Sequence, residues 1–193
     1  MARPRTFDTD EAVEKAMQVF WTHGYEGASL PDLLEGMGLT RGSLYKAFTD
    51  KKTLFLKVLD HYEGKAVRAG VDLLTDPGIP NGAERIMAMF TNSYRAVTEG
   101  DQRGCLLCTA AAGPSTYDDE IAEAVSRGLG AMRDGIDVAL QASPKHADLK
   151  PSARRALADM LVAQYMGLRT MARARIDTET LRNAVRSVGV MLA

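Results

Sequence analysis

One stretch, Ser29 to Asp50 (SLPDLLEGMGLTRGSLYKAFTD), constrains the fold of this chain more than any other. Ser29 is a typical helix N-cap residue, and Asp32 can complete the reciprocal hydrogen bonds of a capping box. Gly38 follows an apolar helical pattern and suits the positive φ at which helices commonly end. Thr40 is then placed to cap a second helix. The stretch therefore predicts two short helices joined by a tight turn.

The second short helix has one apolar and one unusual polar face. Leu44 and Phe48 lie four positions apart, so they must face the interior together. The opposite side carries a residue without a side chain, hydroxyl groups and cations, but no carboxylate; these residues are Arg41, Gly42, Ser43, Tyr45 and Lys46. A missing side chain permits close approach, while hydroxyl groups, cations and a helix N-terminus bind phosphate oxygens. This face predicts a recognition helix that lies in the major groove of DNA.

The same residues resemble the helix-turn-helix of the tetracycline-repressor (TetR/AcrR) family of transcriptional regulators. The positions that follow the family pattern are Gly38, Thr40, Gly42, Leu44, Tyr45, Phe48, Lys51 and Leu54. Ala47 departs from the His or Tyr that is common at its position, which puts one backbone contact in doubt. A Gly-Cys-Leu-Leu run from Gly104 resembles a subset of the same family, so the resemblance reaches beyond the motif.

This resemblance implies a transcriptional regulator, and most simply a repressor, that binds palindromic double-stranded operator DNA as a homodimer. The residues expected to contact DNA are Ser29, Thr40, Arg41, Gly42, Ser43, Tyr45, Lys46 and Lys51. Arg41 and Ser43 are expected at or near the bases, and the others mainly at phosphates. Lys52 beside Lys51 is a further candidate for a phosphate contact. Arg3 and Arg5 belong either to a frayed terminus or to an arm that enters the minor groove.

Beyond the motif, amphipathic helical patterns recur to the end of the chain, without the alternation of strands. The predicted fold is therefore all-α, with about nine helices. A three-helix DNA-binding domain is expected in residues 1–50, and a helical effector-binding and dimerisation bundle in residues 51–193. The first helix should end at Gly24, and the helix that Asp50 caps should end near Gly70. Residues 104–112 should form a short helix of small residues.

The last two helices carry more apolar surface than the edge of a small monomer needs, which predicts a dimer through a four-helix bundle. The residues expected at this interface are Leu161, Leu168, Leu181, Val185, Val188 and Leu192. Ordinary core packing is the alternative. In the family that the chain resembles, the last two helices form the dimer, and a two-fold dimer is what a palindromic operator requires.

Methionine and aromatic residues recur in the same bundle, where they can line a cavity for a small apolar or aromatic effector. The candidate lining consists of Met89, Phe90, Tyr94, Cys105, Met132, Tyr165 and Met166. Plain core packing is the alternative, because methionine is an adaptable filler. Effector binding is expected to move the helix after Asp50 and so to lower the affinity for DNA.

Cys105 supports a different signal. It is expected near a helix N-terminus with Arg103 two residues away, and both features lower the pKa of a thiol. A repressor that senses oxidants or electrophiles through Cys105 is therefore one alternative. Another is that Cys105 and Cys108 are small buried packing residues. A third is a DNA-binding protein whose core docks a protein partner instead of a small molecule.

Composition excludes several other classes of protein. The formal net charge is −1, so DNA affinity must come from local arrangement rather than from bulk charge. Two cysteines and three scattered histidines provide no disulfide framework and no metal site. No phosphate-binding loop or catalytic triad pattern occurs, so neither an enzyme nor a cofactor is expected. No apolar run approaches ~18 residues, so we expect a cytoplasmic protein without a membrane span.

Overall fold

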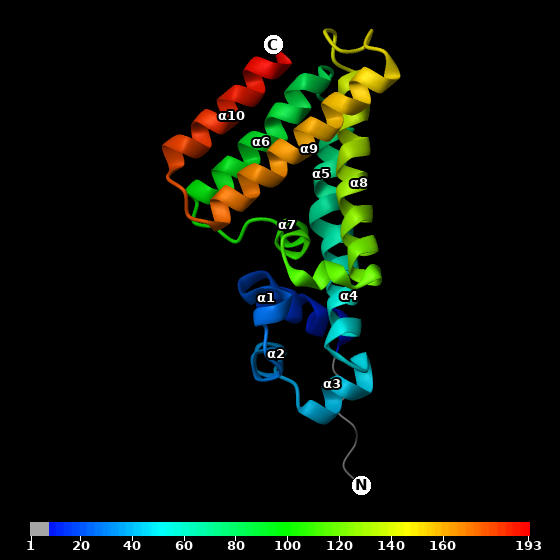
Figure 1. Ribbon diagram of the computed structural model, residues 1–193, viewed down its shortest axis with the longest axis vertical. Helices are drawn as coiled ribbons and strands as arrows, with labels where there is room; N and C mark the ends of the chain where they lie inside the picture. The colour runs from blue at the N-terminus through cyan, green and yellow to red at the C-terminus, as the bar shows by residue number, and fades with distance from the viewer. Residues whose placement is uncertain (1–7) are drawn as a thin grey trace.

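The computed structural model describes residues 8–193, and the predicted basic arm around Pro4 lies outside this range. Within these residues the chain is helical and has no strand, which confirms the all-α prediction. The molecule is elongated, with α1 to α3 at one end and the larger helical bundle at the other (Figure 1). A long helix connects the two ends.

The N-terminal end consists of α1 (Thr9–Gly27), α2 (Leu30–Met37) and α3 (Arg41–Phe48). Ser29 and Asp32 form the predicted capping box of α2, and Gly38 ends that helix with a φ of 65°. The Thr40 hydroxyl accepts a hydrogen bond from the backbone N–H of Ser43 and so caps α3. Both short helices and the turn are therefore confirmed. Local capping and a glycine in the left-handed region are sufficient to define their ends.

Helix α1 differs from the prediction in its last turn. Gly24 leaves the helical conformation as expected, with φ 73° and ψ 173°, but one more turn follows and ends at Gly27. The ring of Tyr25 in this turn packs 4.8 Å from that of Phe55, and Phe20 packs at the same distance from Phe55 on another side. These aromatic contacts hold the extra turn against the connecting helix.

The connecting helix is longer than predicted. It comprises α4 (Lys51–Tyr62), a π-helical segment η1 (Glu63–Val67) and α5 (Arg68–Leu74) without interruption. Gly70 does not end it, because that glycine is a packing position: an added Cβ would lie 3.1 Å from the Met132 sulfur. The glycine thus allows α5 to approach α8 closely.

The bundle contains α6 (Gly82–Thr98), α7 (Leu106–Ala111), the 3-10 turn η2 (Pro114–Tyr117), α8 (Asp119–Gln141), α9 (Pro151–Arg173) and α10 (Thr178–Leu192). With α4, η1 and α5 taken as one helix, residues 8–193 form nine helices, as predicted. Helix α7 starts two residues later than residues 104–112 would place it. Gly104 has a φ of 77°, so it belongs to the preceding loop. In Figure 1, α8 runs beside α4 and α5, while α6, α9 and α10 group together.

The residues predicted for a dimer interface face the interior of the single chain. Their exposed fractions lie between 0% and 9%, in the order Leu161 0%, Leu168 4%, Leu181 0%, Val185 9%, Val188 2% and Leu192 5%. This part of the prediction is wrong, because these residues form the stripe that packs against the neighbouring helices of the same chain. A partner could contact only the opposite, outward faces of α9 and α10.

Candidate nucleic-acid interface

Helix α3 separates its side chains as the sequence predicts. Leu44 and Phe48 are buried, with exposed fractions of 1% and 0%, and they anchor the helix. On the other side Tyr45 is 42% exposed, and Lys46 and Arg41 are exposed as well. The exposed face of α3 therefore carries cationic and aromatic groups on a helix whose position its own core residues fix.

Gly42 opens this face to close approach. No atom lies within 4 Å of the place where its Cβ would be, so packing within the chain does not require a glycine there. Gly36 on α2 is different, because its Cβ would lie 2.4 Å from a methyl carbon of Val19 on α1. One glycine thus seats α2 tightly against α1, whereas the other leaves free space outside α3.

The hydroxyl groups of the site are ordered by the helix caps. The Thr40 and Ser43 hydroxyl oxygens are 3.0 Å apart, within hydrogen-bonding distance. At the start of α2, the Ser29 hydroxyl and backbone N–H both donate to the carboxylate of Asp32. These bonds hold the pKa of Asp32 below its usual value. Ser29, Thr40 and Ser43 are thereby fixed at the N-terminal ends of α2 and α3, where backbone N–H groups attract anions.

Arg41 and Lys46 are unpaired cations of this surface. The Arg41 guanidinium carbon lies 5.7 Å from the centre of the Tyr45 ring, within the range of a cation–π contact. Among the residues that the structure describes, no carboxylate forms an ion pair with Arg41 or Lys46. Their charges are therefore available to a partner.

The two lysines at the start of α4 differ from each other. The Lys51 ammonium lies 4.7 Å from the centre of the Tyr25 ring, and partial burial lowers its pKa. Lys52 pairs with Asp118, 2.7 Å away, and with Glu120, and these acids raise its pKa. The prediction that Lys52 clamps phosphate is therefore wrong, because acids at the start of α8 occupy its ammonium. Lys51 has no such carboxylate partner in the described chain.

Arg173 of α9 fixes the end of α1 to the bundle. Its guanidinium donates to the carbonyl oxygens of Trp21 and Thr22, at 2.8 and 3.0 Å, and to that of Arg103 at 3.1 Å. The break at Gly24 leaves carbonyl groups of the last α1 turn without helical partners, and a cation at a helix C-terminus is favourable. The N-terminal end of the molecule and α9 are thus directly joined.

A second link joins α1 to the connecting helix. The Glu14 carboxylate lies 2.6 Å from the Lys65 ammonium and 2.8 Å from Nε2 of His61. The Lys65 contact first, and the His61 contact second, lower the pKa of Glu14 to about 2. Glu14 therefore stays ionised near neutral pH and holds α1 to the region of the π-helical segment.

A cavity of about 290 Å³, open to solvent on one side, lies between the connecting helix, α6 and α9 and reaches α1. Residues predicted for the effector pocket that line it are Met89, Cys105, Met132 and Tyr165. A larger hollow of about 760 Å³ lies between the connecting helix and α8, but its lining is charged. There Arg127 pairs with Asp60 and Glu63. The smaller cavity matches an apolar ligand better, because most of its wall is apolar.

The other residues predicted for the pocket lie away from the cavity wall. Phe90 is 1% exposed and packs edge-on against Tyr165, with ring centres 5.8 Å apart. The Tyr94 hydroxyl accepts a hydrogen bond from Arg182 of α10, and Met166 packs against the hydrophobic core. None of the three lines this cavity, because α6 and α9 each present only one side to it.

The wall also contains residues that the sequence did not identify as pocket residues, above all Trp21, Tyr62 and Arg169. Trp21 packs in a T-shaped arrangement against Tyr62, at 5.1 Å between ring centres. Arg169 lies within an otherwise apolar helical run, LVAQYMGLRTMA, and that isolated charge was the available signal. A charged residue within such an apolar run commonly has a specific partner or a function.

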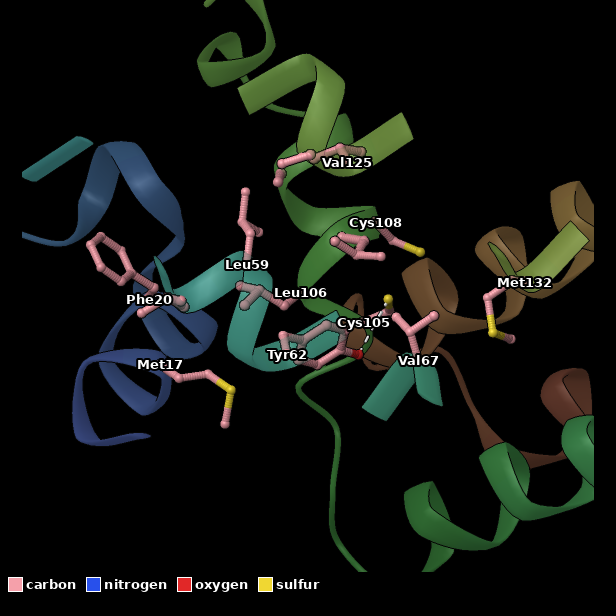
Figure 2. Close-up of a cluster of buried hydrophobic side chains, with 14 of the residues drawn as sticks. Met17, Phe20, Leu59, Tyr62, Val67, Cys105, Leu106, Cys108, Val125 and Met132 are labelled. Atoms are coloured by element: carbon pink, nitrogen blue, oxygen red, sulfur yellow. Dashed lines mark hydrogen bonds between the residues drawn. The ribbon is translucent and has the colours of Figure 1, made fainter. Parts of the chain in front are cut away.

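Cys105 lies at the centre of this region. It occupies the N-cap position of α7, and the Tyr62 hydroxyl donates to its sulfur at 3.4 Å, the bond drawn in Figure 2. The pKa of Cys105 is lowered to about 6, mainly by a hydrogen bond from the Cys108 thiol. The hydrogen bond from the Tyr62 hydroxyl and the positive charge of Arg169 lower it further. The pKa of Cys108 is raised instead, because its thiol donates a hydrogen bond to Cys105 and because burial disfavours the charged thiolate.

Arg103, expected to activate this thiol, is engaged elsewhere. Its guanidinium carbon lies 4.2 Å from the centre of the Trp21 ring, and its Nε donates to Asp101 at 2.9 Å. The positive charge that acts on Cys105 comes from Arg169, which the fold brings next to it. Arg103, which is close to Cys105 in sequence, thus contacts Trp21, whereas the distant Arg169 lowers the pKa of Cys105.

Residues 8–193 contain no group of His, Cys, Asp and Glu side chains arranged to hold a metal ion. In that part of the chain, none of the helices combines the length and the hydropathy that a membrane span requires.

Comparison with known proteins identifies relatives for both ends of the chain. Residues 12–58 match the family described as bacterial regulatory proteins, tetR family. The HTH-type transcriptional repressor ComR of Escherichia coli is 53% identical over 60 residues, which cover 31% of this chain and 29% of ComR. The HTH-type transcriptional regulator YezE of Bacillus subtilis is 30% identical over 189 residues, 96% of each chain.

A solved structure agrees over nearly the whole length. A cysteine mutant of the TetR family transcriptional regulator CifR, complexed with 26-base-pair double-strand operator DNA, superposes with a TM-score of 0.82. It is 33% identical in sequence, and the match covers 96% of this chain and 97% of that of CifR.

Proposed function

The chain belongs to the TetR family of transcriptional regulators, and we propose that it is a repressor that binds palindromic operator DNA as a homodimer. It dissociates from the operator when it binds a small effector. Its relatives regulate transcription, and it is not an enzyme. The observation that carries the proposal is the exposed face of α3, where Arg41, Tyr45 and Lys46 surround the open space at Gly42. This face suits the major groove.

Within the proposed complex, Arg41 and Ser43 contact bases or lie next to them. Thr40, Tyr45, Lys46 and Lys51 hold phosphates, with a further contact from Ser29. Residues 1–50 form the DNA-binding domain in this proposal, and residues 51–193 the effector-binding and dimerisation domain. Because Phe55 packs against both Phe20 and Tyr25, the start of α4 moves with the DNA-binding domain.

The direct test is binding of the purified protein to the DNA upstream of its own gene, measured by fluorescence anisotropy between roughly 50 and 200 mM salt. Over this range a protein that makes about 6–10 phosphate contacts loses roughly 10³ to 10⁵-fold in affinity. Specific binding that weakens with salt supports the proposal. Selection from random DNA covers an operator that lies elsewhere. If neither experiment yields a specific sequence, the proposed function is wrong.

Lys51→Ala should weaken binding to specific and random DNA alike. Loss of one phosphate contact per protomer should reduce the slope of log affinity against log salt by about one unit per contact. Lys52→Ala is the matched control, because Asp118 and Glu120 already bind that ammonium. Anisotropy titrations at several salt concentrations measure both variants. An unchanged slope for Lys51→Ala, or an equal effect of Lys52→Ala, would remove Lys51 from the phosphate contacts.

For the homodimer, we propose the outward faces of α9 and α10. Met160 on α9 is 40% exposed and Val190 on α10 is 78% exposed, although both side chains are apolar. The exposed residues on the same side of α9 as Met160 include three small ones, namely Ala156, Ala163 and Gly167. Small residues allow two helices to approach closely. A dimer that covers these faces would also fit the two-fold symmetry of a palindromic operator.

Met160→Arg should convert the dimer to monomers at micromolar concentration. The two-fold axis places two new charges in one apolar interface, so the dissociation constant of the dimer should rise at least ~100-fold. Sedimentation equilibrium measures this constant. Val138→Arg on α8 is the control, because Val138 is similarly exposed, at 43%, but lies outside the proposed interface. Should Met160→Arg remain dimeric, α9 would not form the interface.

The cavity beside α1 supports a small-molecule signal over a docked protein partner. Its wall includes the buried residues Tyr62, Cys105 and Arg169, and it reaches Trp21 on α1. A ligand there would touch the DNA-binding domain and α9 at once, where Arg173 already joins them. Effector binding can change the affinity for DNA only if it favours one arrangement of these parts over another.

A thiol-based signal through Cys105 is the second candidate, because the pKa of this thiol is lowered to about 6. We expect one thiol per chain to react with iodoacetamide at pH 7, at a rate that rises through pH 6 and then levels off. Cys105→Ser should abolish this reaction, and Cys108→Ser should retain it. If both cysteines stay unreactive until the protein is denatured, burial dominates and the thiol sensor is excluded.

A further inference from the structure

A buried charge without a carboxylate partner belongs to a residue in the wall of the cavity. Arg169 of α9 is 8% exposed, and its Nη2 donates to the carbonyl oxygen of Gly104. In residues 8–193 no Asp or Glu forms an ion pair with it. Its Nε has no hydrogen-bond acceptor among these residues. Burial of a charge without such compensation is strongly unfavourable, so this arginine requires an explanation beyond packing.

A second residue in the wall of the same cavity also has a donor without an acceptor. The Nε1 atom of Trp21 is buried and has no hydrogen-bond partner in the described chain, although buried indole N–H groups usually have one. The ring itself is fixed between the Arg103 guanidinium and the edge of Tyr62. Both Trp21 and Arg169 line the cavity. An indole N–H and a guanidinium can only donate, so both need an acceptor.

The acidic and thiol groups of the neighbourhood already have partners. Asp101, whose pKa Arg169 helps to lower, receives hydrogen bonds from Arg103 at 2.9 and 3.0 Å. The Cys105 sulfur, whose pKa the Arg169 charge helps to lower, accepts a hydrogen bond from the Tyr62 hydroxyl, but in residues 8–193 no hydrogen bond joins this sulfur to Arg169. The acceptor for Arg169 and Trp21 is therefore best supplied from outside the protein.

We propose that the effector is a small organic anion, a carboxylate on an apolar body, whose oxygens bind Arg169 and Trp21 while the body extends toward Met132. This inference rests on the proposed ligand-responsive function. A guanidinium pairs well with a carboxylate, and charge-assisted hydrogen bonds are stronger than neutral ones. In the view of Figure 2, Val67 lies between Tyr62 and Cys105 on one side and the apolar side chain of Met132 on the other.

The size and position of the cavity agree with such a ligand. Its volume of about 290 Å³ lies near the lower end of small-molecule sites, roughly 300 to 1,000 Å³, so the body must be small. A carboxylate shared by Trp21 and Arg169 would bridge α1 and α9. Because Arg173 of α9 donates a hydrogen bond to the Trp21 carbonyl oxygen of α1, a shift of Trp21 would directly change the contact that already connects these two helices.

Trp21 is the only tryptophan of the chain, so its fluorescence reports on this site without a label. The probes are benzoate, phenylacetate and hexanoate, each compared with its neutral amide. We expect at least one carboxylate to change the Trp21 emission and to bind about tenfold or more tightly than its amide. The same carboxylate should release the operator over the same concentration range in an anisotropy assay.

Arg169→Met should abolish the preference for the carboxylate over the amide, and Arg169→Lys should retain part of it because the charge remains. Arg68→Met is the control, because Arg68 pairs with Asp72 and does not line the cavity, and its preference should equal that of the wild type. Thermal unfolding monitors folding of each variant. If Arg169→Met unfolds and Cys105 loses its reactivity in Arg169→Lys, the thiolate of Cys105 is the partner of Arg169 and the inference is wrong.

The outcomes separate this inference from the proposed function. If amides bind and release the operator as well as carboxylates do, the protein is ligand-responsive but the anionic head is wrong. If no carboxylate changes the Trp21 emission at millimolar concentration while operator binding is intact, the inference is equally overturned. If carboxylates bind through Arg169 but the protein recognises no operator, the anion site stands and the proposed function fails.

Discussion

Replacement of both Arg41 and Tyr45 by alanine should lower the affinity for the operator about a thousandfold, on the order of 4 kcal/mol. A good arginine–base contact contributes roughly 1–3 kcal/mol, and a two-fold dimer loses every contact twice. Tyr45 adds a phosphate contact and supports the guanidinium, 5.7 Å from its ring centre. Specific and non-specific affinities should be measured by anisotropy at the same salt concentration.

The control for this double variant is Arg68→Ala. Arg68 is also an exposed arginine, but it lies on α5 and pairs with Asp72 on the side of the connecting helix. It should leave operator affinity unchanged. The fold of the double variant should also be intact, because Leu44 and Phe48, rather than the exposed residues, anchor α3. Retention of specific binding by the double variant would disprove the assignment of α3 as the recognition helix.

Gly82→Ala should destabilise the bundle by about 3 kcal/mol or more, as expected when a side chain is forced into packed backbone. The added Cβ would lie 1.6 Å from the Ala139 carbonyl oxygen and 2.5 Å from its carbon. Neither atom can move without displacing α8. Helix α6 would therefore have to separate from α8 and lose the hydrogen bond from the Gly82 N–H to Ala142. The unfolding temperature should fall by about 6–12 °C.

Gly64→Ala provides the comparison. Gly64 also lies in a helical segment, but no atom is within 4 Å of its Cβ position. Its replacement should leave the free energy of unfolding unchanged or raise it by up to about 1 kcal/mol, because alanine restricts the unfolded chain. Calorimetry of both variants tests the difference. If Gly82→Ala unfolds at the wild-type temperature, the close contact of α6 with α8 is not required for stability.

A series of contacts within the chain connects the proposed effector site to the proposed DNA-binding surface. The recognition helix is seated on α1 through α2, α1 is joined to α9 by Arg173, and the cavity touches α1 at Trp21. The Glu14 ion pairs add a second joint to the connecting helix. A ligand that changes the angle between α1 and the bundle would therefore change the spacing of two recognition helices in a dimer, on which operator binding depends.

The DNA-reading end could be predicted from sequence because its structure depends on neighbours along the chain. The capping box at Ser29, the turn at Gly38 and the cap at Thr40 each act within a few residues, and all are present in the structure. The spacing of Leu44 and Phe48 likewise decides which face of α3 is buried. Local interactions of this kind are the same whatever the rest of the chain does.

The bundle could be predicted only in outline. Apolar residues cover much of α9 and α10, so periodicity did not reveal which stripe faces the chain's own core, and Leu161 and Val188 proved to be interior. The length of the connecting helix was also beyond local signals, since Gly70 is a contact with Met132 rather than an end. Such choices depend on which helices pack together.

The sequence by itself therefore determined the helix-turn-helix, the all-helical class and the exposed cationic face, because caps, turns and side-chain periodicity act locally. Only the tertiary structure shows the cavity, because the residues that define it come from α1, α4, the N-cap of α7 and α9. Trp21, Tyr62, Cys105 and Arg169 are far apart in the chain and meet only when these helices pack. Their contacts arise from the relative placement of helices, which no short stretch of sequence encodes.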